Sequence, residues 1–176
     1  MMLLVYTLIL SLLLINAASE LLVTIADLQK PIHDSTTKHH SRFYARDISF
    51  EGSHIEGVAF NALIPSHQNG DPWSIAAPLV YALPNQGSAD GLMNDALVAG
   101  TIVLFDRDEG LSMCEQVHVA QHAGAIAAII VDSPGGQHEQ HTALRAAIAA
   151  DVNVWRSLSI PAVIVRFERG ERLKSR

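Results

Sequence analysis

The chain has 176 residues, one cysteine, nine histidines and a formal net charge of −6 at pH 7. This length allows one domain of ordinary size with a full hydrophobic core. The acidic balance, without any cluster of lysines and arginines, argues against nucleic acid or an anionic membrane surface as a partner. A single cysteine excludes an intramolecular disulfide.

The N-terminal segment is the first element of the chain. Residues 3–15 are almost continuously apolar, and residues 17–19 are small, as a signal peptidase requires. The apolar run is too short to cross a bilayer comfortably. We expect residues 1–19 to be a secretory signal peptide, cleaved after Ala17 or Ser19; the alternative is an uncleaved N-terminal anchor. The mature chain is then expected in the secretory-pathway lumen or outside the cell, without a membrane span.

Residues 20–74 are expected to supply the N-terminal strands and loops of the domain. A first strand is predicted at 21–25, ending before Asp27 and Pro31. Two β-rich runs separated by Gly52-Ser53 predict a hairpin. These runs are residues 43–50 and 55–64, with loops expected at 31–42 and 65–71.

The domain core is expected at residues 75–176, around a central βαβ unit. A short strand at 79–83 and a helical turn within 91–99 lead to an apolar run at 101–105. Ser112 and Glu115 have the spacing of a capping box at the start of a helix. Gly124 is placed to end that helix, and a second apolar run follows at 126–131. Two strands joined by a helix are expected to lie parallel in one sheet.

The remaining elements complete the sheet. The alanine-rich residues 139–150 predict a second helix, and residues 151–159 predict a loop that contains Trp155. A last strand is expected at 160–165, where Pro161 is tolerated at the start. Residues 168–173 begin a helical segment, and the chain stops three residues later.

Two of the nine histidines have a spacing that could bind a metal ion. His118 and His122 lie four residues apart on one helix face, a spacing that can bind one metal ion. The helix lacks the glutamate that a zincin motif carries directly after its first histidine, because residue 119 is valine. We therefore predict no metal site, and a histidine-rich metal binder stays a minor alternative.

Two further chemical possibilities are weak. Cys114 sits in the first helical turn, where it could pair with His118 as a nucleophile, but no oxyanion hole or orienting residue accompanies it. The acids Asp106, Asp108 and Glu109 crowd one turn without the spacing of a calcium loop. The sequence predicts no catalytic residue and no cofactor.

Binding is the remaining possibility, and its site follows from architecture. Ligands of parallel α/β sheets tend to meet the loops at the carboxyl ends of the strands. Those loops are expected at 106–111 and 132–138, with 151–159 nearby. The candidate binding residues, for a protein or peptide partner, are Arg107, Asp108, Glu109, Trp155 and Arg156. For Trp155 the alternative role is to cover the core, since tryptophan does both.

The order of these signals resembles the protease-associated (PA) domain family over residues 75–173. The matching positions are Gly100, Ile102, Val103, Leu104, Ala120, Gln121, Ala123, Gly124, Ala125, Ile160, Pro161, Gly170 and Leu173. The resemblance implies an α/β fold of the PA-like swivelling β/β/α kind, an open β-barrel or sandwich with flanking helices. It also implies a domain without catalysis of its own that binds peptides or proteins.

The sequence departs from the family pattern at two points. Where the family usually carries a cysteine before its helix, this chain has Leu111, and Cys114 follows three residues later. The family also adds a closing strand after the Gly-x-x-Leu of residues 170–173, whereas this chain ends first. Either that strand is dispensable, or the sequence is an N-terminal fragment of a larger secretory-pathway protein. Such a protein would be a protease, a mannosidase-like protein, a sorting receptor or a RING ubiquitin ligase.

Overall fold

The structure, a computed structural model, describes residues 22–31, 44–51, 53–59, 74–107, 110–135 and 151–175. The strands are β1 (Leu22–Pro31), β2 (Tyr44–Phe50), β3 (Ser53–Ala59), β4 (Ser74–Tyr81), β5 (Ile102–Asp106), β6 (Ala127–Val131) and β7 (Ala162–Val165). The helices are α2 (Asp95–Val98), α3 (Met113–His122), α5 (Val152–Ser157) and α6 (Phe167–Lys174). The expected signal peptide, the loop at 65–71 and the helix at 139–150 lie outside the described residues, as does the loop at 31–42 beyond Pro31.

The seven strands form a closed barrel in the order β1-β2-β3-β7-β6-β5-β4. The expected α/β class and the parallel βαβ unit are confirmed, because β5 and β6 pair in parallel from Ile102↔Ala127 to Asp106↔Val131. The barrel was expected to be open, and this detail is wrong. β3 pairs with β7 and β1 pairs with β4, so that neither sheet edge is left without a partner. β7 already has a neighbour on each side, which leaves this ring complete without a strand after α6.

The strands of the parallel half are buried on both faces, as their unbroken apolar runs predict. Along β5, Ile102 and Leu104 belong to a core inside the barrel, with residues from β1, β2 and β3. Val103 and Phe105 belong to a second core, between the barrel and the helices. Successive side chains of β5 point to opposite faces of the sheet, so a single strand contributes residues to both cores.

Helix α3 forms where its terminal signals predict. The Ser112 backbone N–H donates to Glu115 Oε2 at 2.7 Å, and the Glu115 N–H donates to Ser112 Oγ at 3.2 Å, which completes the capping box. At the other end Gly124 adopts φ +84°, a left-handed conformation that glycine allows. Met113, Val117 and Ala120 are buried against the second core.

Several element boundaries differ from the sequence predictions. β1 continues past Asp27 to Pro31, and β4 begins at Ser74, before Pro78. Pro78 pairs with Leu22 of β1, and the pairing of β4 with β5 starts after it, at Leu79. The loop expected at 151–159 contains α5, whose first turn is capped when the Asp151 side chain accepts a hydrogen bond from the Val154 N–H. A six-residue helix is too short to show apolar periodicity.

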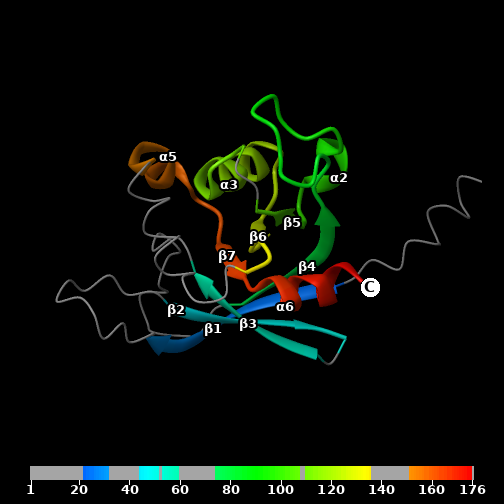
Figure 1. Cartoon of the computed structure of the whole chain (residues 1–176), viewed down its shortest axis with the longest axis vertical. Coiled ribbons are helices and arrows are strands. Elements are labelled where there is room, and N and C mark those ends of the chain that lie inside the picture. The colour runs from blue at the N-terminus through cyan, green and yellow to red at the C-terminus, as the bar shows by residue number, and fades with distance from the viewer. Residues whose placement is uncertain are drawn as a thin grey trace, which may run out of the picture.

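Figure 1 shows α2, α3 and α5 grouped on one side of the strands, with α6 apart from them and close to the C-terminus. Leu173 of α6 and the partly buried Phe167 pack against the core inside the barrel. Among the residues described, no helix is long and apolar enough to cross a membrane.

Candidate functional site

The carboxyl edge, meaning the residues at the carboxyl ends of β4, β5 and β6 with the last turn of α6, is where a binding site was expected. There the Tyr81 hydroxyl donates to Asp106 Oδ2, and Lys174 Nζ forms an ion pair with Asp106 Oδ1. Lys174 Nζ also lies 2.6 Å from Glu171 Oε1. Lys174 of α6 thus forms an ion pair with Asp106, the last residue of β5. The Asp106 carboxylate is therefore occupied by partners within the fold and is not a free calcium ligand.

The pKa values of this cluster follow from burial and pairing. Burial, together with the hydrogen bond to Asp106, raises the pKa of Tyr81 to about 12. Burial alone would lower the pKa of Lys174, but its hydrogen bonds with Asp106, Glu171 and Tyr81 outweigh this and raise it. At neutral pH the cluster therefore holds a neutral phenol and a charged ammonium group.

Arg107, a predicted binding residue, also bonds within the carboxyl edge. Its Nη1 donates to Asp132 Oδ1 at 2.6 Å, and the same oxygen accepts the Ser133 N–H at 3.0 Å. Asp132 is only 3% exposed, so its carboxylate depends on these donors. The guanidinium therefore has a structural partner at the end of the neighbouring strand.

The structure does not bring Trp155 or Arg156 to Arg107. Asp108 and Glu109 lie outside the described residues. Trp155 packs, half-buried, against the second core, and Arg156 is exposed on α5. The end of α5 contacts the last turn of α3, since Gln121 Nε2 donates to Ser157 O at 3.1 Å. That turn leads into the amino end of β6, the opposite end of the parallel strands from Arg107.

The structure does not favour Cys114 as a nucleophile, a possibility that was already weak from the sequence. Cys114 is fully buried. Burial raises the pKa of its thiol to about 12, with smaller contributions from Asp151 and Glu115, so the thiolate is scarcely populated at neutral pH. His118 Nε2 instead faces His122 Nε2 at 3.1 Å. In the part of the chain that the structure describes, no three His, Cys, Asp or Glu residues are grouped to hold a metal ion.

A different region presents its side chains outward: the outer surface, defined as residues 83–97 together with the solvent-facing side of α3. Asn94 fixes its backbone, because Asn94 Oδ1 accepts the Leu83 N–H at 3.0 Å and Asn94 Nδ2 donates to Tyr81 O at 2.9 Å. The Met93 N–H donates to Leu83 O at 2.7 Å. Leu83 and Met93 are thereby held next to each other.

The outer surface exposes large apolar side chains from this fixed backbone. Met93 is 87% exposed, Leu97 is 67% exposed and Leu83 is 48% exposed. The buried Gln116 of α3 ties the segment to the barrel, since its Nε2 donates to both Gln86 O and Asp106 O at 2.8 Å. Several exposed apolar side chains in one ordered segment indicate an interaction surface more than single scattered ones do.

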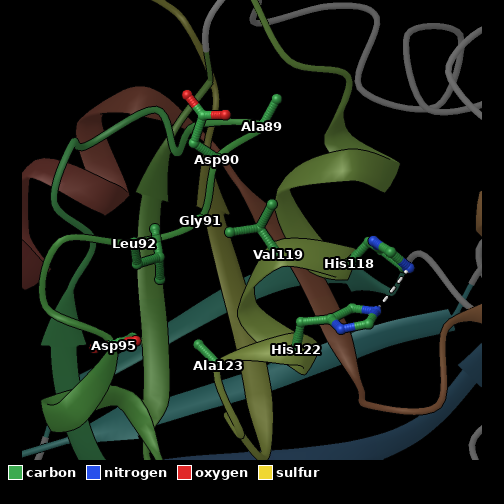
Figure 2. A pocket seen from close by; sticks show the side chains of 9 residues that line it. All are labelled: Ala89, Asp90, Gly91, Leu92, Asp95, His118, Val119, His122 and Ala123. Carbon is green, nitrogen blue, oxygen red and sulfur yellow. Dashed lines mark hydrogen bonds between the residues drawn. The ribbon is translucent and has the colours of Figure 1, made fainter.

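A shallow pocket of about 380 Å³ lies within the outer surface. Its lining residues are Ala89, Asp90, Gly91, Leu92, Asp95, His118, Val119, His122 and Ala123. Figure 2 shows the residues of the 89–95 segment on one side, and the two histidine rings projecting from α3 on the other with their nitrogens toward each other. The pocket therefore joins the loop segment to the helix.

Sequence reasoning missed the outer surface. The sequence predicts only a helical turn within 91–99 for this region, and nothing in the sequence shows which apolar residues of a turn-rich segment stay exposed. The one available signal was an excess of large apolar residues, Leu83, Leu92, Met93 and Leu97, in a segment that turn residues dominate. Leu92 is the member of that set that is buried.

The barrel with its parallel βαβ unit and helical cover defines a small α/β domain. Residues 75–173 match the family described as the PA domain. The match spans more than half of the chain, which therefore belongs to the protease-associated domain family, as its motifs predict. A comparison with curated proteins finds no match.

One similar solved structure is that of BSAP, a zinc aminopeptidase from Bacillus subtilis. It is 22% identical, with a TM-score of 0.44, and the likeness covers 86% of this chain and 30% of the aminopeptidase. The chain thus spans less than a third of the length of that enzyme.

Proposed function

We propose that this chain is a non-catalytic PA domain of the secretory pathway or the extracellular space, and that it binds a protein or peptide partner through its outer surface. The single observation that carries the proposal is the exposure of Leu83, Met93 and Leu97 on a backbone held by Asn94. An ordered segment loses little conformational entropy on binding, so exposed apolar area there converts more fully into affinity.

The adjoining pocket supports a partner with apolar side chains. A volume of about 380 Å³ is at the lower end of the size range of small-ligand pockets, and its walls combine apolar and polar groups. One apolar side chain of a peptide could occupy it while neighbouring positions cover Met93 and Leu97. Arg156, exposed on α5, remains a candidate for an additional charged contact with the partner.

The absence of catalysis is part of the proposal, and the surroundings of Cys114 support it. Its thiol is buried and its pKa is raised to about 12, which removes the nucleophile that the sequence offered. Turnover of peptide or ester substrates by the purified chain would contradict the proposal. The alternative, an N-terminal fragment of a larger secretory-pathway enzyme or receptor, is tested separately by reading whether the coding sequence continues in frame past Arg176.

Peptide selection tests the binding surface directly. A random peptide library displayed on phage is panned on the purified chain, and individual selected peptides are measured by fluorescence anisotropy. Met93→Asp and Leu97→Asp should each weaken binding about tenfold or more, because each places a charge against an apolar contact. Val152→Asp is the matched control, since it adds the same charge at an exposed apolar residue of α5.

The result would contradict the proposal if Val152→Asp weakened binding as much as Met93→Asp did. It would also do so if panning enriched no peptide over an unrelated protein. The location is tested separately by expressing the chain in a secretory host and measuring the mass of the product. The expected N-terminus is residue 18 or residue 20. A product that retains residues 1–19 would contradict the prediction that they are a cleaved signal peptide.

A further inference from the structure

The histidine pair of α3 has a geometry that the sequence could not show. His118 Nε2 and His122 Nε2 are 3.1 Å apart, with ring centroids 4.3 Å apart and planes tilted by 57°. Four-residue spacing on a helix brings side chains together, but it does not decide which ring nitrogens converge. Here the two Nε2 atoms face each other at hydrogen-bond distance on the outer side of α3, as Figure 2 shows.

We propose that His118 and His122 chelate one divalent transition-metal ion, of the class that prefers imidazole ligands, such as Zn²⁺ or Cu²⁺. With metal–nitrogen bonds of about 2.05 Å, a 3.1 Å separation corresponds to an N–metal–N angle of about 98°. That angle lies between the right angle of square or octahedral sites and the tetrahedral angle of about 109°. An ion bound there takes the place of the proton shared by the two nitrogens, and the two rings turn so that both lone pairs face it.

The helix that carries the pair is held rigidly, which favours chelation. Its start is fixed by the capping box of Ser112 and Glu115, and its inner face packs into the second core through Met113, Val117 and Ala120. Little conformational entropy beyond that of the two rings is lost when an ion binds. The outer side of the pair is open, since His122 is exposed and His118 is partly exposed. Water molecules can complete the coordination.

The local electrostatics also favour a cation at this place. His122 lies in the last turn of α3, where the helix dipole is negative. Asp90 and Asp95 are exposed on the far wall of the same pocket, and the whole chain carries a net charge of −6. The carboxylates are not grouped with the histidines as ligands, so the proposed site has two protein ligands. This inference does not rest on the proposed partner binding, although both histidines line the pocket assigned there to the partner.

Isothermal titration of the purified chain with Zn²⁺ tests the site. We expect saturable binding at tens of micromolar metal, with one ion bound by His118 and His122. Affinity for that ion should fall by about tenfold or more in His118→Gln or His122→Gln, because each removes one of two ligands, and the number of bound ions should fall by one in the double variant. His54→Gln, at an exposed position of β3, is the matched control and should bind as the wild type does.

Broadening of amide resonances by Cu²⁺ maps the site on the unaltered chain, so the test does not depend on a variant that folds. We expect resonances of residues 115–123 to broaden first. Undiminished Zn²⁺ binding in the double variant, broadening centred on another part of the chain, or no saturable binding would each overturn the inference. Far-UV circular dichroism identifies any variant whose helix content has changed.

Discussion

The carboxyl edge and the outer surface of this domain use their side chains in opposite ways. At the carboxyl edge, charged residues pair with one another: Arg107 with Asp132, and Lys174 with Asp106. On the outer surface, Met93 and Leu97 are exposed to solvent. The edge where a ligand was expected pairs its charges within the fold, and a region for which no binding residue was predicted offers the accessible apolar side chains.

The difference shows what charges at strand ends do in a small barrel. Each partner of a pair comes from a distant element, so the pairs fix β5 against β6 and α6 against β5. Asp132 is almost fully buried, and a buried carboxylate is stable only with its donors in place. The sequence shows which residues are charged but not which of them pair within the fold. A charged residue such as Arg107, which forms an internal ion pair, can therefore be mistaken for a binding residue.

The largest expected effect tests whether Arg107 belongs to the fold or to a ligand site. Arg107→Ala should lower the free energy of unfolding by about 3–5 kcal/mol, because it leaves the buried Asp132 carboxylate without its cation. Urea denaturation followed by circular dichroism measures the change. Arg156→Ala, at an exposed arginine, should change stability by no more than about 0.5 kcal/mol.

If Arg107→Ala is as stable as the wild type, the contrast drawn between the carboxyl edge and the outer surface is contradicted. The guanidinium would then be available to a partner, and the carboxyl edge would regain its place as the candidate site. If Arg156→Ala were instead the destabilising change, α5 would contribute to the fold through that arginine more than its exposure indicates.

Much of the parallel half could be predicted because its signals are local. The capping box of Ser112 and Glu115, the glycine at 124 and the unbroken apolar runs each depend on neighbours in the sequence, and each is confirmed. Barrel closure could not be predicted in the same way. It depends on β3 meeting β7 through Val58 and Ala59, a contact between segments about a hundred residues apart.

The next effect concerns the close approach of α6 to β6. A Cβ atom on Gly170 would lie 2.2 Å from Val131 Cγ1 and 2.5 Å from Cγ2. Alanine usually stabilises a helix relative to glycine by about 1 kcal/mol, but here the overlap should dominate and cost about 1–3 kcal/mol net. Thermal unfolding measures the loss, with Arg172→Ala on the exposed side of α6 as the control.

A double variant sharpens this prediction. Val131→Ala removes both γ-carbons, so Gly170→Ala combined with Val131→Ala should cost less than the sum of the two single changes. Additive costs would contradict the steric explanation. They would mean that α6 does not pack against β6 at Gly170, and the ion pair of Lys174 with Asp106 would lose its support.

The candidate site was harder to predict than the fold for a physical reason. Exposure of Met93 follows from the hydrogen bonds of Asn94 to Leu83 and Tyr81, which fix the direction of the segment. The histidine pair is similar, since its spacing is visible in the sequence while the 3.1 Å convergence depends on side-chain rotamers. Both proposed sites depend on side-chain direction, which local sequence patterns do not encode.

The smallest effect is confined to alkaline pH and tests the cluster of Tyr81, Asp106 and Lys174. The pKa of Tyr81 is raised to about 12, and that of Lys174 is raised as well. Groups with raised pKa values bind protons more tightly in the folded state than in the unfolded one. Their stabilisation is complete below the unfolded pKa of about 10 and is lost as pH rises toward 12.

Tyr81→Phe should therefore make stability fall less steeply between pH 10 and 12, at a cost of about 1 kcal/mol at neutral pH for the lost hydrogen bond. Tyrosinate absorbance, taken as wild type minus variant, should isolate one phenol that ionises near pH 12. An ionisation near pH 10 in that difference would mean that Tyr81 is solvated as an ordinary phenol. The carboxyl edge would then be open to solvent, and its contrast with the outer surface would be lost.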